Sequence, residues 1–66
     1  MIAYIREQGA KISREGRRLI VNTPDMKHTI FVESLEQLLL FGNVQLTSSA
    51  VFLLLRENID TVFLRG

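Results

Sequence analysis

Residues 38–55 read LLLFGNVQLTSSAVFLLL, and this stretch decides the fold of the chain. Its first apolar run ends at Gly42–Asn43, a pair that tolerates positive φ and lets an extended chain bend or reverse. Thr47 then offers a side-chain oxygen to the first free amides of a helix, and a run of large apolar residues follows this cap. The stretch therefore predicts a buried strand, a sharp turn and a core helix from about Thr47 to Glu57.

Short stretches of alternating polarity flank this central stretch. Together with the apolar run at residues 38–41 they predict six strands, the other five at residues 2–6, 10–14, 18–22, 28–32 and 61–64. Turns are expected at Gln8–Gly9 and Glu15–Gly16, and a loop is expected at Pro24, which has no amide hydrogen to give to a sheet. Ser34 can cap a single helical turn, with Gln37 at the capping-box spacing. The first three strands should pair in chain order as a meander.

The fold class that this pattern predicts is α+β. About six short, mainly antiparallel strands form a twisted or split sheet, and one helix near Thr47–Glu57 packs against it. The chain has 66 residues, 47% of them hydrophobic, so residues 1–66 make one small domain. A domain of this length buries only about 60% of its unfolded surface. We therefore expect a partner subunit or a neighbouring domain to help it fold.

Composition excludes several kinds of site. There is no cysteine and only one histidine, which rules out disulfides and argues against a structural zinc site. The net charge is +1, so any basic surface for nucleic acid must be local. The N-terminus has no signal-peptide pattern, and no apolar run approaches the roughly 18 residues that span a bilayer. These observations predict a soluble cytoplasmic protein with no membrane partner.

Four segments, taken in order, carry more information than any single residue. They are Glu7–Ala10, Glu15–Gly16, residues 35–47 (LEQLLLFGNVQLT) and residues 58–64 (NIDTVFL). In this order they resemble the N-terminal domain of the CRISPR adaptation integrase, the universal CRISPR-associated protein that inserts new spacers. The resemblance covers essentially the whole chain, and residues 40–47, LFGNVQLT, are its most specific part.

The resemblance implies a two-domain, metal-dependent DNA endonuclease and integrase that acts as a homodimer, usually with a small companion CRISPR-associated subunit. In that family the β-rich N-terminal domain dimerises and touches double-stranded DNA. A glutamate, a histidine and a further acid in the helical C-terminal domain hold Mg or Mn. Those residues would follow Gly66, where the chain stops straight after its last strand. We accordingly assign no catalytic residue and no metal ligand to residues 1–66 and expect this chain alone not to be an enzyme.

Candidate DNA contacts lie in the turns. Arg14, Arg17 and Arg18 flank one hairpin turn, and arginine's forked donors match phosphate oxygens, although Glu15 sits among them. Gln8 and Gln45 also lie in predicted turns, from which their amides could reach a phosphate or a base edge. These five residues are the predicted DNA contacts: Arg14, Arg17, Arg18, Gln8 and Gln45.

Other polar residues have simpler interpretations. His28 lies on a predicted strand with no suitably spaced partner, which indicates an edge-strand histidine rather than a base. Glu33 and Glu36 stand three residues apart without a third ligand, as solvated turn residues do. Thr47 has no base in motif form, so it is a helix cap rather than a nucleophile. A second function class stays open, a stand-alone homodimeric interaction module without catalysis, and the sequence after Gly66 would decide between the two.

Overall fold

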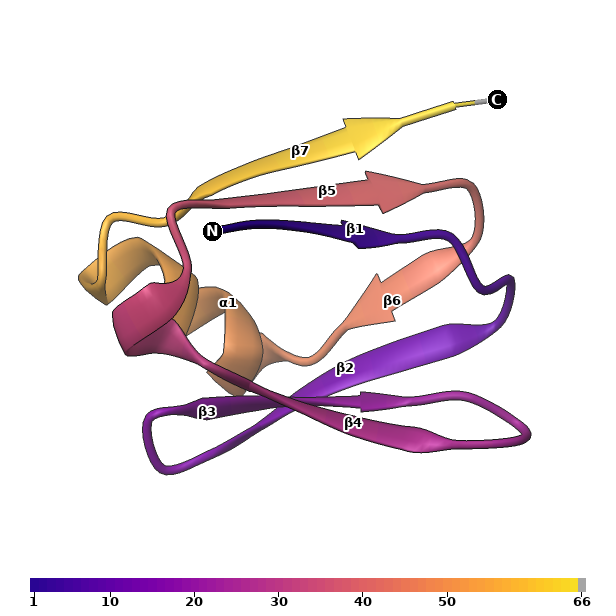
Figure 1. Cartoon of the computed structure of the whole chain (residues 1–66), viewed down its shortest axis with the longest axis horizontal. Coiled ribbons are helices and arrows are strands. Elements are labelled where there is room, and N and C mark those ends of the chain that lie inside the picture. Colours follow the sequence, from indigo (N-terminus) through magenta and orange to yellow (C-terminus); the bar gives the residue numbers. More distant parts are fainter. Residues whose placement is uncertain (66) are drawn as a thin grey trace.

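The computed structural model describes residues 1–65 and folds them into seven strands, one short 3₁₀ helix and one α-helix (Figure 1). In chain order the elements are β1 (Ile2–Ile5), β2 (Ala10–Glu15), β3 (Arg18–Asn22), β4 (Lys27–Phe31), η1 (Val32–Ser34), β5 (Gln37–Phe41), β6 (Val44–Leu46), α1 (Ser48–Arg56) and β7 (Asp60–Leu64). The prediction of an α+β fold with a single core helix is confirmed. Within this part of the chain no helix is long and apolar enough to cross a membrane.

The strands form two separate sheets that lie one above the other in Figure 1. One sheet is three-stranded and parallel throughout, in the order β1-β5-β7. The other is four-stranded and mixed, in the order β4-β3-β2-β6. The split sheet is therefore confirmed. The additional strand, β6, is only three residues long, which explains why alternation did not reveal it.

The expectation of mainly antiparallel pairing is wrong. Only β2 with β3 and β3 with β4 pair antiparallel, while β1 with β5, β5 with β7 and β2 with β6 pair parallel. The first strand does not fold back on the second, because residues 6–9 carry the chain from one sheet to the other. Alternation identifies a strand and its buried face, but a parallel partner lies far along the sequence and leaves no local signal.

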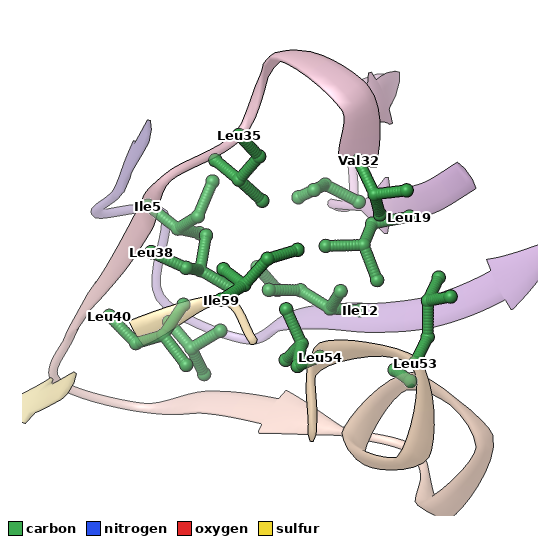
Figure 2. Close-up of a cluster of buried hydrophobic side chains, with 14 residues drawn as sticks. Ile5, Ile12, Leu19, Val32, Leu35, Leu38, Leu40, Leu53, Leu54 and Ile59 are labelled. Atoms are coloured by element: carbon green, nitrogen blue, oxygen red, sulfur yellow. The ribbon is translucent and has the colours of Figure 1, made fainter. Parts of the chain in front are cut away.

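The hydrophobic core fills the space between the two sheets, and α1 lies beside it (Figure 2). Strand β5 supplies Leu38 and Leu40, both fully buried, as the middle strand of the parallel sheet. Its sequence QLLLF is nearly continuous in apolar residues, which is typical of a parallel strand covered on both faces. From the helix, Leu53 and Leu54 point into the same core.

Both ends of α1 follow the sequence prediction. Thr47 is the N-cap, and its Oγ1 accepts a hydrogen bond from the Ala50 amide at 3.2 Å. Glu57 is the C-cap, and Asn58 follows in the left-handed region with φ of 56°. A cap is a local signature, since the cap residue and the amide that it bonds are three residues apart.

The short helical turn before β5 is present, but Ser34 does not cap it. Phe31 occupies the N-cap position of η1 and makes no side-chain cap bond. Ser34 is the last residue of the turn, and its hydroxyl donates a hydrogen bond back to the carbonyl oxygen of Phe31 at 3.1 Å. Hydroxyl groups commonly bond to a carbonyl three or four residues earlier, and this bond competes with a role as N-cap.

Candidate nucleic-acid interface

The turn between β2 and β3 carries the three arginines of the predicted DNA contact. Arg14 Nε donates a hydrogen bond to the carbonyl oxygen of Gly16 at 2.7 Å. Arg18 Nη2 lies 2.9 Å from Glu15 Oε1, and the side chains of this ion pair are 43% and 62% exposed. Arg14 is thus engaged by the backbone of its own turn, and Arg18 by a neighbouring carboxylate.

Arg17 lies between two carboxylates from other parts of the fold. Its Nη2 donates to Glu57 Oε1 at 2.8 Å, and its Nη1 lies 3.4 Å from Glu33 Oε2. The hydrogen bond to Glu57, followed by the charges of Glu57 and Glu33, raises the pKa of Arg17 above its ordinary value. The guanidinium therefore ties the hairpin turn to the end of α1 and to η1. Two of the three hairpin arginines, Arg17 and Arg18, are thus paired with acids, and the contact of all three with DNA stays a prediction.

Gln8 holds together the two places where the chain passes between the sheets. Its Nε2 donates to the carbonyl oxygens of Arg6 and Phe41, both at 3.0 Å, and its Oε1 accepts from the Asn43 amide at 2.8 Å. The adjacent Gly9 amide donates to the Asn43 carbonyl oxygen at 2.8 Å. Both amide hydrogens of the side chain are used in the fold. A contact between Gln8 and DNA remains a prediction, and it would have to compete with these bonds.

The same contact explains why Gly42 is a glycine. Its φ is +73°, and a Cβ built at this position would stand 2.6 Å from Gln8 Oε1. Any side chain here would be strained and would displace the Gln8 amide. The bend that the sequence predicts at Gly42–Asn43 is therefore confirmed, and its partner is a side chain more than thirty residues away.

Gln45 differs from Gln8 in its place in the fold and in its hydrogen bonding. It lies on β6, at an outer edge of the mixed sheet, and pairs in register with Lys11 of β2. Its side chain is exposed and makes no hydrogen bond with any residue that the structure describes. Of the five predicted contacts, Gln45 is the one whose side chain makes no hydrogen bond within residues 1–65, and its DNA contact stays a prediction.

The acidic residues and His28 do not form a metal centre. Glu33 is paired with Arg17, and Glu36 Oε2 accepts from the N-terminal ammonium group of Met1 at 2.8 Å. That hydrogen bond, together with the positive charge, lowers the pKa of Glu36 below its ordinary value of 4.5. His28 lies exposed on the edge strand β4. Among residues 1–65 no three His, Cys, Asp or Glu side chains are grouped so that they could hold a metal ion.

The outward face of the parallel sheet is mostly apolar, and its two polar side chains, Gln37 and Asp60, lie at one end and are hydrogen-bonded to each other at 2.9 Å. In register, β1, β5 and β7 place six apolar side chains on it: Ile2, Tyr4, Leu39, Phe41, Val62 and Leu64. The rings of Tyr4 and Phe41 stack with centroids 6.3 Å apart, and the Arg6 guanidinium lies 5.3 Å from the Phe41 centroid. Tyr4 is 54% exposed. Below we call these six side chains the outer apolar face.

A second apolar surface lies on α1. Phe52 and Leu55 are 67% and 70% exposed, so the described part of the chain buries only one side of the predicted core helix. Beside the helix a cavity of about 540 Å³ opens between Leu46, Leu54 and Phe63. Residues 1–65 thus leave apolar side chains on this side of α1 exposed to solvent.

Comparison with known proteins places the chain in a family. The model of the CRISPR associated protein Cas1 family matches residues 3–66. This chain belongs to the Cas1 family. The match confirms the resemblance of the four sequence segments, and the chain corresponds to the N-terminal domain of Cas1 proteins.

Solved structures of Cas1 proteins share the fold. A CAS1 protein from Thermotoga maritima superposes with a TM-score of 0.87 at 22% identity, over 98% of this chain and 22% of that one. A TtCas1–DNA complex gives a TM-score of 0.83 at 20% identity, over 98% and 22% of the two chains. A partial Cas6-RT-Cas1–Cas2 complex gives 0.87 at 25% identity, over 97% and 19%.

The chain therefore spans about a fifth of the length of these Cas1 structures. No curated protein sequence matches it.

Proposed function

We propose that this chain is the non-catalytic N-terminal domain of a metal-dependent DNA endonuclease and integrase that inserts new spacers into CRISPR arrays. In this proposal the domain forms the homodimer and positions double-stranded DNA. The metal chemistry, with Mg or Mn, belongs to a helical domain that follows residue 66. The observation that carries the proposal is the match of the Cas1 family model to residues 3–66. A small companion subunit is part of the proposal, since a related structure is a complex with Cas2.

The dimer contact that we propose uses the outer apolar face. Parallel sheets occur almost only with both faces covered, and in this chain the core covers one face of the β1-β5-β7 sheet. The middle strand contributes Leu39 and Phe41 to the other face, which remains open. A second copy of the chain that presents the same face would cover both at once, as the isologous interface of a two-fold dimer does.

The test is the oligomeric state of surface variants of the natural full-length protein. Tyr4→Glu places a charge on the outer apolar face, next to Leu39 and Phe41, and should shift the protein from dimer to monomer in sedimentation velocity. Phe52→Glu is the matched control, because Phe52 is even more exposed but lies on α1. This control should leave the dimer intact.

A dimer that survives Tyr4→Glu but dissociates with Phe52→Glu would move the contact to the helix. A wild-type protein that sediments as a monomer at micromolar concentration would remove dimerisation from the proposed function altogether.

A further inference from the structure

The outer face of the mixed sheet carries a row of polar side chains that crosses all four strands. Gln45 on β6 pairs in register with Lys11 on β2, Lys11 with Asn22 on β3, and Asn22 with Lys27 on β4. All four residues are exposed. The residues that alternate with them, such as Ala10, Ile12 and Val21, are buried in the core, so this row faces away from the core.

The neighbouring row on this face is also free of acids. It consists of Ser13 on β2, Ile20 on β3 and Thr29 on β4, which are in register with one another. The next row on this face holds Glu15, which is ion-paired with Arg18, and Asp25 lies in the turn that joins β3 to β4. The two rows thus combine two lysines, two amides, two hydroxyl groups and the apolar Ile20, without a carboxylate.

In the described part of the chain the two lysines on this face have no ion-pair partner, in contrast to most of the arginines. Arg17, Arg18 and Arg56 each pair with a carboxylate, while Arg6 lies over the Phe41 ring. Within residues 1–65 neither Lys11 nor Lys27 has an acidic oxygen within 4.0 Å. A free ammonium group gains the full counterion-release benefit when it meets a phosphate, whereas a paired guanidinium must first give up its acid.

We infer that this face, centred on Lys11 and Lys27, contacts the phosphate backbone of duplex DNA, with Asn22 and Gln45 as hydrogen-bond donors beside the two charges. The inference rests on the proposed function and names the surface through which the domain would position DNA. The two lysines stand two strands apart, or about 10 Å at the backbone, and their flexible side chains can adjust to nearby phosphates.

Two features favour duplex DNA over a single strand. The two rows carry no aromatic side chain, and Phe31, one row further on beside Arg18, is a single exposed ring, whereas proteins that hold single strands stack successive bases on aromatic rings. Lysines, amides and hydroxyl groups are the donors that bind phosphate oxygens and fix the position of a duplex without reading its sequence. The surface is therefore suited to positioning, with little dependence on base sequence.

The experiment measures duplex affinity of the natural full-length protein across a series of salt concentrations. The probe is a fluorescent duplex of mixed sequence, read by anisotropy. In the double variant Lys11→Gln and Lys27→Gln, the slope of log affinity against log salt should become shallower by about two, because each lost phosphate contact removes about one. Affinity at 0.1 M salt should fall about tenfold or more.

The matched control is the double variant Arg17→Gln and Arg18→Gln, which removes the same charge from paired positions. It should change the slope by clearly less than the lysine variant does. Asn22→Ala with Gln45→Ala should weaken binding with little change in slope, since amides release no counterions. Equal thermal midpoints for the variants and the wild type ensure that folding is not the cause.

The outcomes distinguish the DNA-positioning function from the surface assigned to it. A wild-type protein that does not bind the duplex overturns the DNA-positioning function itself. Wild-type binding with an unchanged slope in the lysine variant overturns this surface and leaves the function standing. Loss of affinity for single-stranded DNA alone, with the duplex affinity unchanged, overturns the assignment to duplex DNA.

Discussion

A single residue, Gln8, shows how the two sheets of this domain are joined. Its side-chain amide makes hydrogen bonds to the backbone of the bend at Phe41–Asn43. Position 42 of this bend must be glycine, because a Cβ there would clash with the Gln8 amide. The sequence predicted both turns, because glycine and asparagine mark them locally. It could not reveal the bond between them, since the partners are more than thirty residues apart. Gln8 therefore looked like a free turn residue with the same potential as Gln45.

The difference between the two glutamines gives a stability prediction. Gln8→Ala removes three hydrogen bonds at the sheet junction. It should lower the free energy of unfolding by about 1–2 kcal/mol, because water can satisfy part of the freed backbone groups. Gln45→Ala should change it by less than about 0.5 kcal/mol, as exposed substitutions usually do. Urea denaturation of both variants measures the difference, and equal midpoints would show that the Gln8 bonds do not hold the junction.

The ion pair of Glu36 with the N-terminal ammonium group gives a pH prediction. The pKa of Glu36 is lowered in the folded chain, so the pair stabilises the fold above the ordinary value of 4.5 and loses this effect as pH falls through the lower folded value. Glu36→Gln should therefore make stability fall less steeply with pH below 4.5. The effect is small because the pair is exposed. Thermal midpoints between pH 3 and pH 7 provide the test, and a steeper acid-side fall in the variant would contradict it.

At the scale of elements, α1 was the feature most accurately predicted. Its cap at Thr47, its apolar run and its end at Glu57–Asn58 are all local signals, and each is confirmed. What periodicity did not supply was the direction of the buried side, because Leu53, Leu54 and Leu55 are the same residue type in sequence. The fold buries Leu53 and Leu54 and leaves Leu55 exposed. Strand β6 was not predicted, because three residues are too few to show an alternating pattern.

The adjacent leucines allow a strict test of the helix. Leu54→Asp should destabilise the domain by about 4 kcal/mol or more, comparable with its whole stability, because it places an unpaired charge in the core. Leu55→Asp changes the same residue type one position later, where the side chain is 70% exposed, and should leave a cooperative melt. Circular dichroism distinguishes the two variants. A melt of Leu54→Asp that equals the wild type would contradict the placement of α1 in the core.

At the scale of the whole molecule, the split into two sheets was predictable but the pairing was not. Alternation and turns located most strands, yet three of the five pairings join segments that are distant in sequence and parallel in direction. The candidate site shows the same limit. Residue types pointed to the arginines of the hairpin, and only the fold revealed that Glu33 of η1 and Glu57 at the end of α1 engage Arg17. The alternation at Lys11 was visible in the sequence, but its alignment with Lys27 depends on the register of three strands.

The measurement that tests the central claim most directly is the native mass of the natural full-length protein mixed with a duplex of mixed sequence. A domain that both dimerises and positions DNA predicts a species of two protein chains on one duplex. Two chains without DNA, at concentrations where the duplex is in excess, would contradict the positioning role and favour a homodimeric interaction module. A single chain on the duplex would contradict the dimer.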